Sequence, residues 1–147
     1  MTLVLAAAGP DPVAWKAQDT PVTALKPGAR FSIKLVGRIQ EGWHMYSMKP
    51  VVDGPIPTRV WIAEGQPFLL AGIIKASAPQ NVQDPSFNME VELYEGEAEF
   101  TLPLRVSPGA AAQSLSLVVH ASYQTCNNKI CLPPKTVKVE VPVTILK

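Results

Sequence analysis

Proline and glycine interrupt this chain at short intervals, and these interruptions limit what it can fold into. The 147 residues include 15 prolines and 9 glycines. Proline lacks a backbone donor and clashes with the preceding turn of a helix, so most candidate helices would be broken. A helical hydrophobic period is hard to find between the interruptions. The pattern therefore favours an all-β chain.

Between the interruptions lie runs of β-branched and aromatic residues in which apolar and polar side chains alternate. Phe31, Ile33 and Leu35, for example, share one face of a predicted strand, with Ser32 and Lys34 on the other. Such alternation is typical of half-buried antiparallel strands. The predicted strands cover residues 30–39, 59–62, 91–94, 98–106, 114–123 and 136–145.

Short strands separated by turn-rich segments indicate one antiparallel β-sandwich domain, which we place at residues 21–147. Residues 107–113, SPGAAAQ, are predicted to form a turn between two long neighbouring strands. Residues 1–20 are predicted to be an extended leader. Within it, the apolar residues 3–8 resemble the end of a secretory signal, which suggests export.

Charge and hydrophobicity exclude two classes of function. The net charge is +1 and no basic cluster occurs, so the sequence has no support for nucleic-acid binding. No apolar run approaches the ~20 residues that a membrane-spanning helix needs. With 47% hydrophobic residues, the chain can bury a core without help from a metal or a disulfide.

The only two cysteines, Cys126 and Cys131, are separated by four residues in the stretch YQTCNNKICLPP. In the chain-entropy picture, a bridge that closes such a short loop stabilises a fold by about 2 kcal/mol, against about 4.7 kcal/mol for a hundred-residue loop. A disulfide here is therefore poorly placed as a staple. It is better placed for thiol–disulfide exchange near the surface.

Other interpretations of the pair remain open at this point. A zinc site needs about four ligands, and beside the two cysteines the chain has only two distant histidines, His44 and His120. Two inert buried thiols are a second possibility. A third is an inert hairpin disulfide, which would suit a secreted immunoglobulin-like binding or adhesion module.

The residues around the cysteines resemble a known family. A strand ending in VVHASYQTC, a short polar insert and then ICLPPKTVKVEVPV is similar to the N-terminal periplasmic domain of the DsbD thiol:disulfide interchange protein family. The upstream segments EGWHMYS and QDPSFNMEVELYEGEAEFTLPLRV support the resemblance, which extends over about residues 31–143. The Cys-to-Pro-Pro segment is its specific part.

This resemblance implies an immunoglobulin-like fold and a protein-disulfide reductase domain that needs no cofactor and no metal. Its partners would be thioredoxin-like domains: one in the same polypeptide, periplasmic disulfide isomerases and the thioredoxins of cytochrome c maturation. The domain would be periplasmic, as the soluble part of an inner-membrane protein whose membrane domain passes on electrons from the cytoplasm.

The resemblance also assigns roles to the cysteines. Cys131 corresponds to the cysteine that forms mixed disulfides with partners, and Cys126 to the one that resolves them. The insert between them is one residue shorter than the usual family spacing. Lys129 lies within this insert, where its charge would favour a thiolate.

Four upstream residues complete the predicted site. Phe87 corresponds to the phenylalanine of a loop that folds over the disulfide, and Asp84 to the acid of that loop. Tyr46 and His44 stand where the family has two tyrosines, so His44 is a departure, and its imidazole could move protons during exchange. A second departure is Pro85, which would stiffen the loop.

Overall fold

The structure is a computed structural model, and it describes residues 11–147. Within this range the chain forms thirteen strands and no α-helix. The strands are β1 (Val13–Ala17), β2 (Val22–Leu25), β3 (Arg30–Ile39), β4 (His44–Tyr46), β5 (Arg59–Ile62), β6 (Phe68–Leu70), β7 (Lys75–Ala76), β8 (Gln80–Asp84), β9 (Met89–Tyr94), β10 (Glu97–Val106), β11 (Gln113–Tyr123), β12 (Thr125–Cys126) and β13 (Lys135–Ile145). No helix that could span a membrane is found in residues 11–147.

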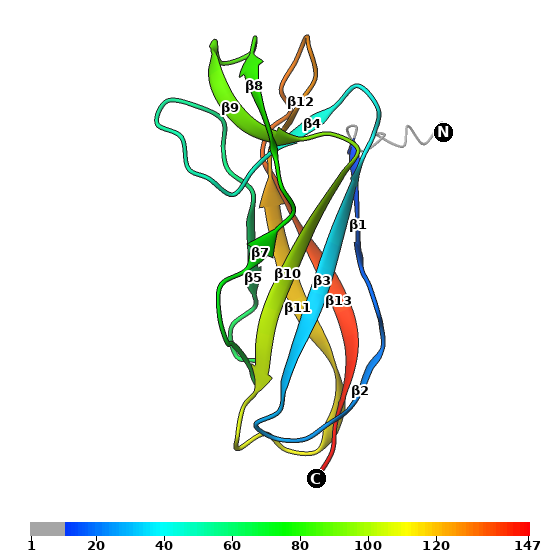
Figure 1. Ribbon diagram of the computed structural model, residues 1–147. Coiled ribbons are helices and arrows are strands. Elements are labelled where there is room, and N and C mark those ends of the chain that lie inside the picture. Colours follow the sequence, from blue (N-terminus) through cyan, green and yellow to red (C-terminus); the bar gives the residue numbers. More distant parts are fainter. Residues whose placement is uncertain (1–10) are drawn as a thin grey trace, which may run out of the picture.

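Two sheets face each other along the length of the molecule (Figure 1). One has the strand order β1-β3-β10-β6, with β7 also paired to β10, and the other has the order β2-β13-β11-β5. All pairs are antiparallel except β2 with β13. We call these two sheets the body. The immunoglobulin-like β-sandwich expected from the sequence is confirmed.

The long strands of the body follow the alternation in the sequence. The strand predicted at residues 30–39 has these bounds in the structure, and the one predicted at 114–123 begins one residue earlier. On β11, Leu117, Val119 and Ala121 are buried while the residues between them are only partly so. Alternate side chains of a strand point to opposite faces, so one face of each sheet lies in the interior.

The segment SPGAAAQ connects β10 to β11, but it does not join hydrogen-bonded neighbours as the sequence suggested. β10 is paired to β3 on one side and to β6 and β7 on the other, whereas β11 lies between β13 and β5 in the opposite sheet. The connection therefore crosses from one sheet to the other. Local sequence marks the turn, but it carries no information on which sheet receives the next strand.

β1 lies inside the segment predicted to be an extended leader. It pairs with β3 from Val13 opposite Ile39 to Ala17 opposite Leu35, and both of its end residues are buried. The edge of this sheet is therefore completed by residues that the domain boundary predicted at residue 20 would leave out. The suggested signal remnant at residues 3–8 lies outside the described residues.

The interior of the body is one continuous apolar cluster between the two sheets. Phe100 and Leu102 of β10 are fully buried in it, as are Leu117 of β11 and Val141 of β13. Burial of a large apolar side chain stabilises a fold by about 1.5–3 kcal/mol. This cluster is the main source of stability for the domain.

A third, smaller sheet forms one end of the molecule, at the top of Figure 1, far from the C-terminus. Its strand order is β12-β4-β9-β8. We call this sheet, with the turns at residues 84–88 and 127–130, the tip. It has its own small buried cluster, in which Tyr46, Val91 and Leu93 surround Cys126.

Candidate functional site

The two cysteines form a disulfide across a hairpin at the tip. Cys126 and Cys131 stand opposite each other as an antiparallel pair, with their Cα atoms 4.0 Å apart. On one side of the pair, the Asn127 N–H donates to Ile130 O at 2.9 Å; on the other, the Leu132 N–H donates to Thr125 O at 2.9 Å. The cysteines thus occupy a non-hydrogen-bonded position, where facing residues approach most closely.

Asn127 closes this hairpin without help from the sulfurs. Its Oδ1 accepts the backbone N–H groups of Lys129 and Ile130, both at 2.8 Å. A side chain that bonds its own backbone in this way stabilises a tight turn. The two thiols would therefore stay opposite each other after the disulfide is reduced. Sequence reasoning missed this role, although an asparagine directly after the first cysteine is a turn signal.

The two sulfur-bearing residues differ in exposure. Cys126 is fully buried in the small cluster with Tyr46, Val91 and Leu93, whereas Cys131 is exposed. The free thiols considered from the sequence are absent from residues 11–147, since both cysteines are bonded. A nucleophile from solution meets Cys131 first. Attack on its sulfur makes Cys126 the leaving group.

Phe87 lies on the turn between β8 and β9, and it packs against the cluster that contains Cys126. Its ring meets the ring of Tyr46 edge to face, with centroids 5.8 Å apart and planes at 89°. The turn is closed by the Asn88 N–H, which donates to Asp84 O at 2.7 Å, and Asn88 has a φ of 50°. Asparagine tolerates this left-handed conformation better than most residues.

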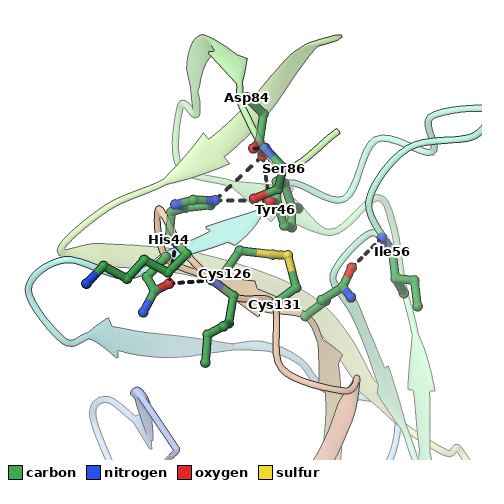
Figure 2. Close-up of a disulfide and its surroundings, with 11 residues drawn as sticks. His44, Tyr46, Ile56, Asp84, Ser86, Cys126 and Cys131 are labelled. Carbon is green, nitrogen blue, oxygen red and sulfur yellow. Dashed lines mark hydrogen bonds and ion pairs between the residues drawn. A yellow bond between two sulfur atoms is a disulfide. The ribbon is translucent and has the colours of Figure 1, made fainter. Parts of the chain in front are cut away.

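Three polar side chains meet beside the disulfide, and the structure buries all of them (Figure 2). The hydroxyl of Tyr46 donates to Asp84 Oδ2 at 2.5 Å, and His44 Nε2 lies 3.0 Å from that hydroxyl. His44 Nε2 is also 3.6 Å from Asp84 Oδ2. The other carboxylate oxygen, Asp84 Oδ1, accepts the Ser86 N–H at 2.8 Å. Strands β4 and β8 are thereby joined through one carboxylate.

Burial of the Tyr46 phenol, together with its hydrogen bond to Asp84 and the charge of that carboxylate, raises the pKa of Tyr46 well above its usual value. The phenol therefore keeps its proton and directs it at Asp84. Because a hydroxyl has only one proton to donate, His44 Nε2 must carry a hydrogen and donate to the Tyr46 oxygen. The cluster thus assigns the tautomer of the neutral imidazole.

The predicted site residues thus gather at one end of the molecule although Tyr46 and Asp84 are 38 residues apart. Lys129 lies in the hairpin turn, with an exposed side chain, so it is near the cysteines in sequence but not part of the buried cluster. Pro85 is also exposed. Phe87, Asp84, Tyr46 and His44 contact one another or the cluster around Cys126.

Two residues that sequence reasoning missed fasten the long 47–58 segment to the site. Gln124 Oε1 accepts the Ile56 N–H at 3.1 Å. Ile56 is labelled near the disulfide in Figure 2. Thr58, fully buried, donates its hydroxyl to Tyr46 O at 2.6 Å. Gln124 comes two residues before Cys126, so its place in the motif was visible, but its partner was not.

Comparisons with known proteins agree with the fold and with the family resemblance. The sequence profile of the family described as thiol:disulfide interchange protein DsbD, N-terminal, matches residues 12–142. Among solved structures, the chain is similar to the N-terminal domain of DsbD from Neisseria meningitidis in the reduced form. The identity is 20%, 75% of each chain is covered and the TM-score is 0.51, so this likeness concerns the fold. No curated protein sequence matches the chain.

Two further solved structures match at lower TM-scores. One is a family 123 glycoside hydrolase from Clostridium perfringens, with 10% identity, 92% of this chain and 28% of that chain covered, and a TM-score of 0.39. The other is AvmM, described as catalysing macrocyclization in alchivemycin A biosynthesis, with 7% identity, 90% and 89% covered, and a TM-score of 0.35. Neither likeness bears on the site.

The family profile covers most of the 147 residues, including the whole hairpin that carries the disulfide. The matched segment also begins at β1 and includes the strands that bury Cys126. Disulfide, fold and profile point to one chemistry, thiol–disulfide exchange. The chain belongs to the family of N-terminal domains of the thiol:disulfide interchange protein DsbD.

Proposed function

We propose that this domain relays two electrons in the periplasm by opening and remaking the disulfide between Cys126 and Cys131. The unequal exposure of the two cysteines carries the proposal. Cys131 is exposed on the hairpin, and Cys126 is enclosed beneath it. A permanent clasp gains nothing from such a difference, whereas an exchange reaction needs one reachable sulfur and one that leaves and returns.

Reduction of the domain begins when a thiolate of a thioredoxin-like partner attacks Cys131 Sγ in the oxidised domain. The S–S bond breaks, a mixed disulfide forms between the partner and Cys131, and Cys126 leaves as a thiolate. The partner's second thiolate then attacks the partner's first sulfur, the one bonded to Cys131, and releases Cys131. The partner is oxidised to a disulfide, and the two protons that its thiols lost balance the two that the cysteines take up.

The same steps run in reverse toward a client. Reduced Cys131 attacks the client disulfide, and Cys126 resolves the mixed disulfide to restore the original bond. Because the Asn127 turn holds the hairpin closed, Cys126 stays opposite Cys131 while the partner is attached. Fixed proximity of this kind speeds an intramolecular step greatly.

The proposed partners are proteins with a thioredoxin fold. The electron donor would be a thioredoxin-like domain of the same polypeptide, recharged through a membrane domain. The clients would be periplasmic disulfide isomerases and the thioredoxins of cytochrome c maturation. Membership of the DsbD N-terminal family supports this assignment.

Two side chains have proposed auxiliary roles. Phe87 would shield the disulfide from stray thiols, and its packing on the Cys126 cluster supports this role. Lys129 would favour the Cys131 thiolate by its charge, since a nearby cation stabilises a thiolate. Its position in the turn between the cysteines supports this second role.

A trapping experiment tests the relay. The probe is a purified thioredoxin whose resolving cysteine is replaced by alanine and whose attacking cysteine is activated as a mixed disulfide with thionitrobenzoate. The Cys126→Ala variant should capture the probe rapidly through Cys131 and release the coloured thiol. The Cys131→Ala control retains only the buried sulfur and should react at least about tenfold more slowly, because access limits exchange. Equal rates would show that the relay proposal is wrong.

A further inference from the structure

His44 is one of only two histidines in the chain, and it lies buried at the tip. Only 6% of its surface is exposed, and 1% of that of Asp84. Its Nε2 atom is 3.0 Å from the Tyr46 hydroxyl and 3.6 Å from Asp84 Oδ2. The exchange reaction described above uses none of these three groups. The exchange reaction therefore does not explain why a titratable ring lies beside a buried carboxylate.

Asp84 fastens the turn that carries Phe87. Its backbone oxygen accepts the Asn88 N–H at 2.7 Å and its Oδ1 accepts the Ser86 N–H at 2.8 Å. Its Oδ2 accepts the proton of the Tyr46 hydroxyl on β4. One carboxylate thus shapes the 84–88 turn and also ties it to β4, the strand that pairs with Cys126.

We propose that His44 is a positioning residue whose protonation tightens the attachment of the 84–88 turn to β4 and so slows access of reductants to the disulfide at low pH. The proposal rests on the proposed function, because it assigns a pH-dependent control to the same site. Neutral His44 donates one hydrogen bond to Tyr46. The imidazolium keeps that bond and adds an attraction to the Asp84 carboxylate, which is strong where water is excluded.

All but one of the charged groups around His44 are negative, so they attract an imidazolium. Asp84 faces it from β8, while Glu41 and Glu95 line the cavity of about 380 Å³ on which the ring borders. On β12, the residue paired with His44 is the bonded Cys126, which does not titrate. The exception is Lys129 in the neighbouring hairpin, whose exposed side chain is screened by solvent.

The test compares the oxidised domain with its His44→Gln variant, which retains an N–H donor for Tyr46 but cannot become charged. The rate of reduction by dithiothreitol is measured for both proteins at a series of pH values between about pH 5 and about pH 8. The ratio of the two rates at each pH cancels the thiolate fraction of the reductant. We expect a ratio near one at high pH that rises by about fivefold at low pH, in favour of the variant.

Two controls make the result specific. His120→Gln removes the other histidine, which stacks on Trp61 on the body, and its rate ratio should not change with pH. In an Asp84→Asn background the carboxylate charge that attracts the imidazolium is gone, so His44→Gln should no longer alter the pH profile. A constant ratio for His44→Gln, or an equal change for His120→Gln, overturns the proposal.

A measurement on the wild type covers the case in which His44→Gln does not fold. The protection factors of the Ser86 and Asn88 amides against hydrogen exchange should be severalfold higher at low pH, while those of β11 stay constant. Equal protection at both pH values overturns the proposal. The dithiothreitol experiment needs no protein partner. If it gave the expected result while the trapping experiment failed, the relay proposal would be wrong and the role of His44 would stand.

Discussion

The body of this domain contains four strands of 10 or 11 residues, whereas no strand of the tip is longer than the 6 residues of β9. In the body, β3 and β10 each have 10 residues and β11 and β13 each have 11, whereas in the tip β4 has 3 and β12 has 2. Long strands bury whole rows of apolar side chains, and short ones cannot. The tip therefore relies on a small cluster, a disulfide and the bonds to Asp84.

This difference suits the proposed chemistry. Regions with few buried apolar contacts open locally at lower free energy than the core does. A site that must admit a partner's thiolate belongs in such a region, because opening there leaves the core intact. In the proposed function, the body is the support and the tip is the region in which the disulfide is opened and remade.

The largest expected effect is a difference in the free energy of unfolding between the same substitution made in the body and in the tip. Phe100→Ala removes a fully buried ring from the body and should lower the free energy of unfolding by about 3–5 kcal/mol. Phe87→Ala removes a partly buried ring from the tip and should lower it by about 1 kcal/mol or less. Urea unfolding of both variants measures the difference.

Phe87→Ala should also speed reduction of the disulfide by dithiothreitol severalfold, since the ring packs on the cluster around Cys126. Phe100→Ala should leave that rate almost unchanged under conditions in which it remains folded. If the two variants lost similar amounts of stability, body and tip would form one cooperative core, and the comparison would be wrong.

The second effect concerns the disulfide itself. Reduction of the wild type should lower the free energy of unfolding by about 2 kcal/mol at most, because the bond closes a short loop. Hydrogen exchange should become faster in β12 and the 127–130 turn and stay unchanged in β11. A reduced domain that unfolds, or that loses protection in the body, would show that the bond is a structural staple.

The smallest effect is at Asp11, which joins β1 to the ends of β11 and β13 where body and tip meet. Its Oδ1 accepts the Tyr123 hydroxyl at 3.0 Å, and its Oδ2 lies 2.7 Å from Lys135 Nζ. Burial raises the pKa of Asp11, but the hydrogen bonds from Lys135, Val13 N–H and Tyr123 outweigh it and lower the pKa below its usual value.

A carboxyl whose pKa is lowered by folding stabilises the fold above its unfolded-state pKa, and this contribution is lost as the pH falls through the folded-state pKa. Asp11→Asn should therefore cost less than about 1 kcal/mol near neutral pH, since the pair is partly exposed. The difference from wild type should vanish in acid. Glu140→Gln, exposed on β13, is the control, and equal pH profiles for both variants would contradict the assignment.

Much of the fold was predictable because its strands are long. The alternation around Phe31, Ile33 and Leu35 identifies β3 without any knowledge of its partners. β1 was missed because a five-residue strand in a segment that resembles a leader carries too little pattern. Its place depends on pairing with β3, more than ten residues further along the chain, and local sequence does not encode that contact.

The site was predictable in part for a different reason. The family resemblance predicted that one site contains His44, Tyr46, Asp84 and Phe87, but it did not predict which of them contact one another. The bond from Tyr46 to Asp84 joins residues 38 positions apart, and only the pairing of both β4 and β8 with β9 creates it. Gln124 belongs to the cysteine motif, yet its partner Ile56 comes from a distant segment.

By itself, the sequence determined the long strands of the body and which two sulfurs can bond, because alternation is a local property and the chain has no third cysteine. Only the tertiary structure decided that Cys126 is buried and Cys131 exposed. Burial depends on which distant strands cover a residue, and here β4 and β9 cover one sulfur and leave its neighbour open. The proposed direction of attack, from the partner onto Cys131, rests on that difference.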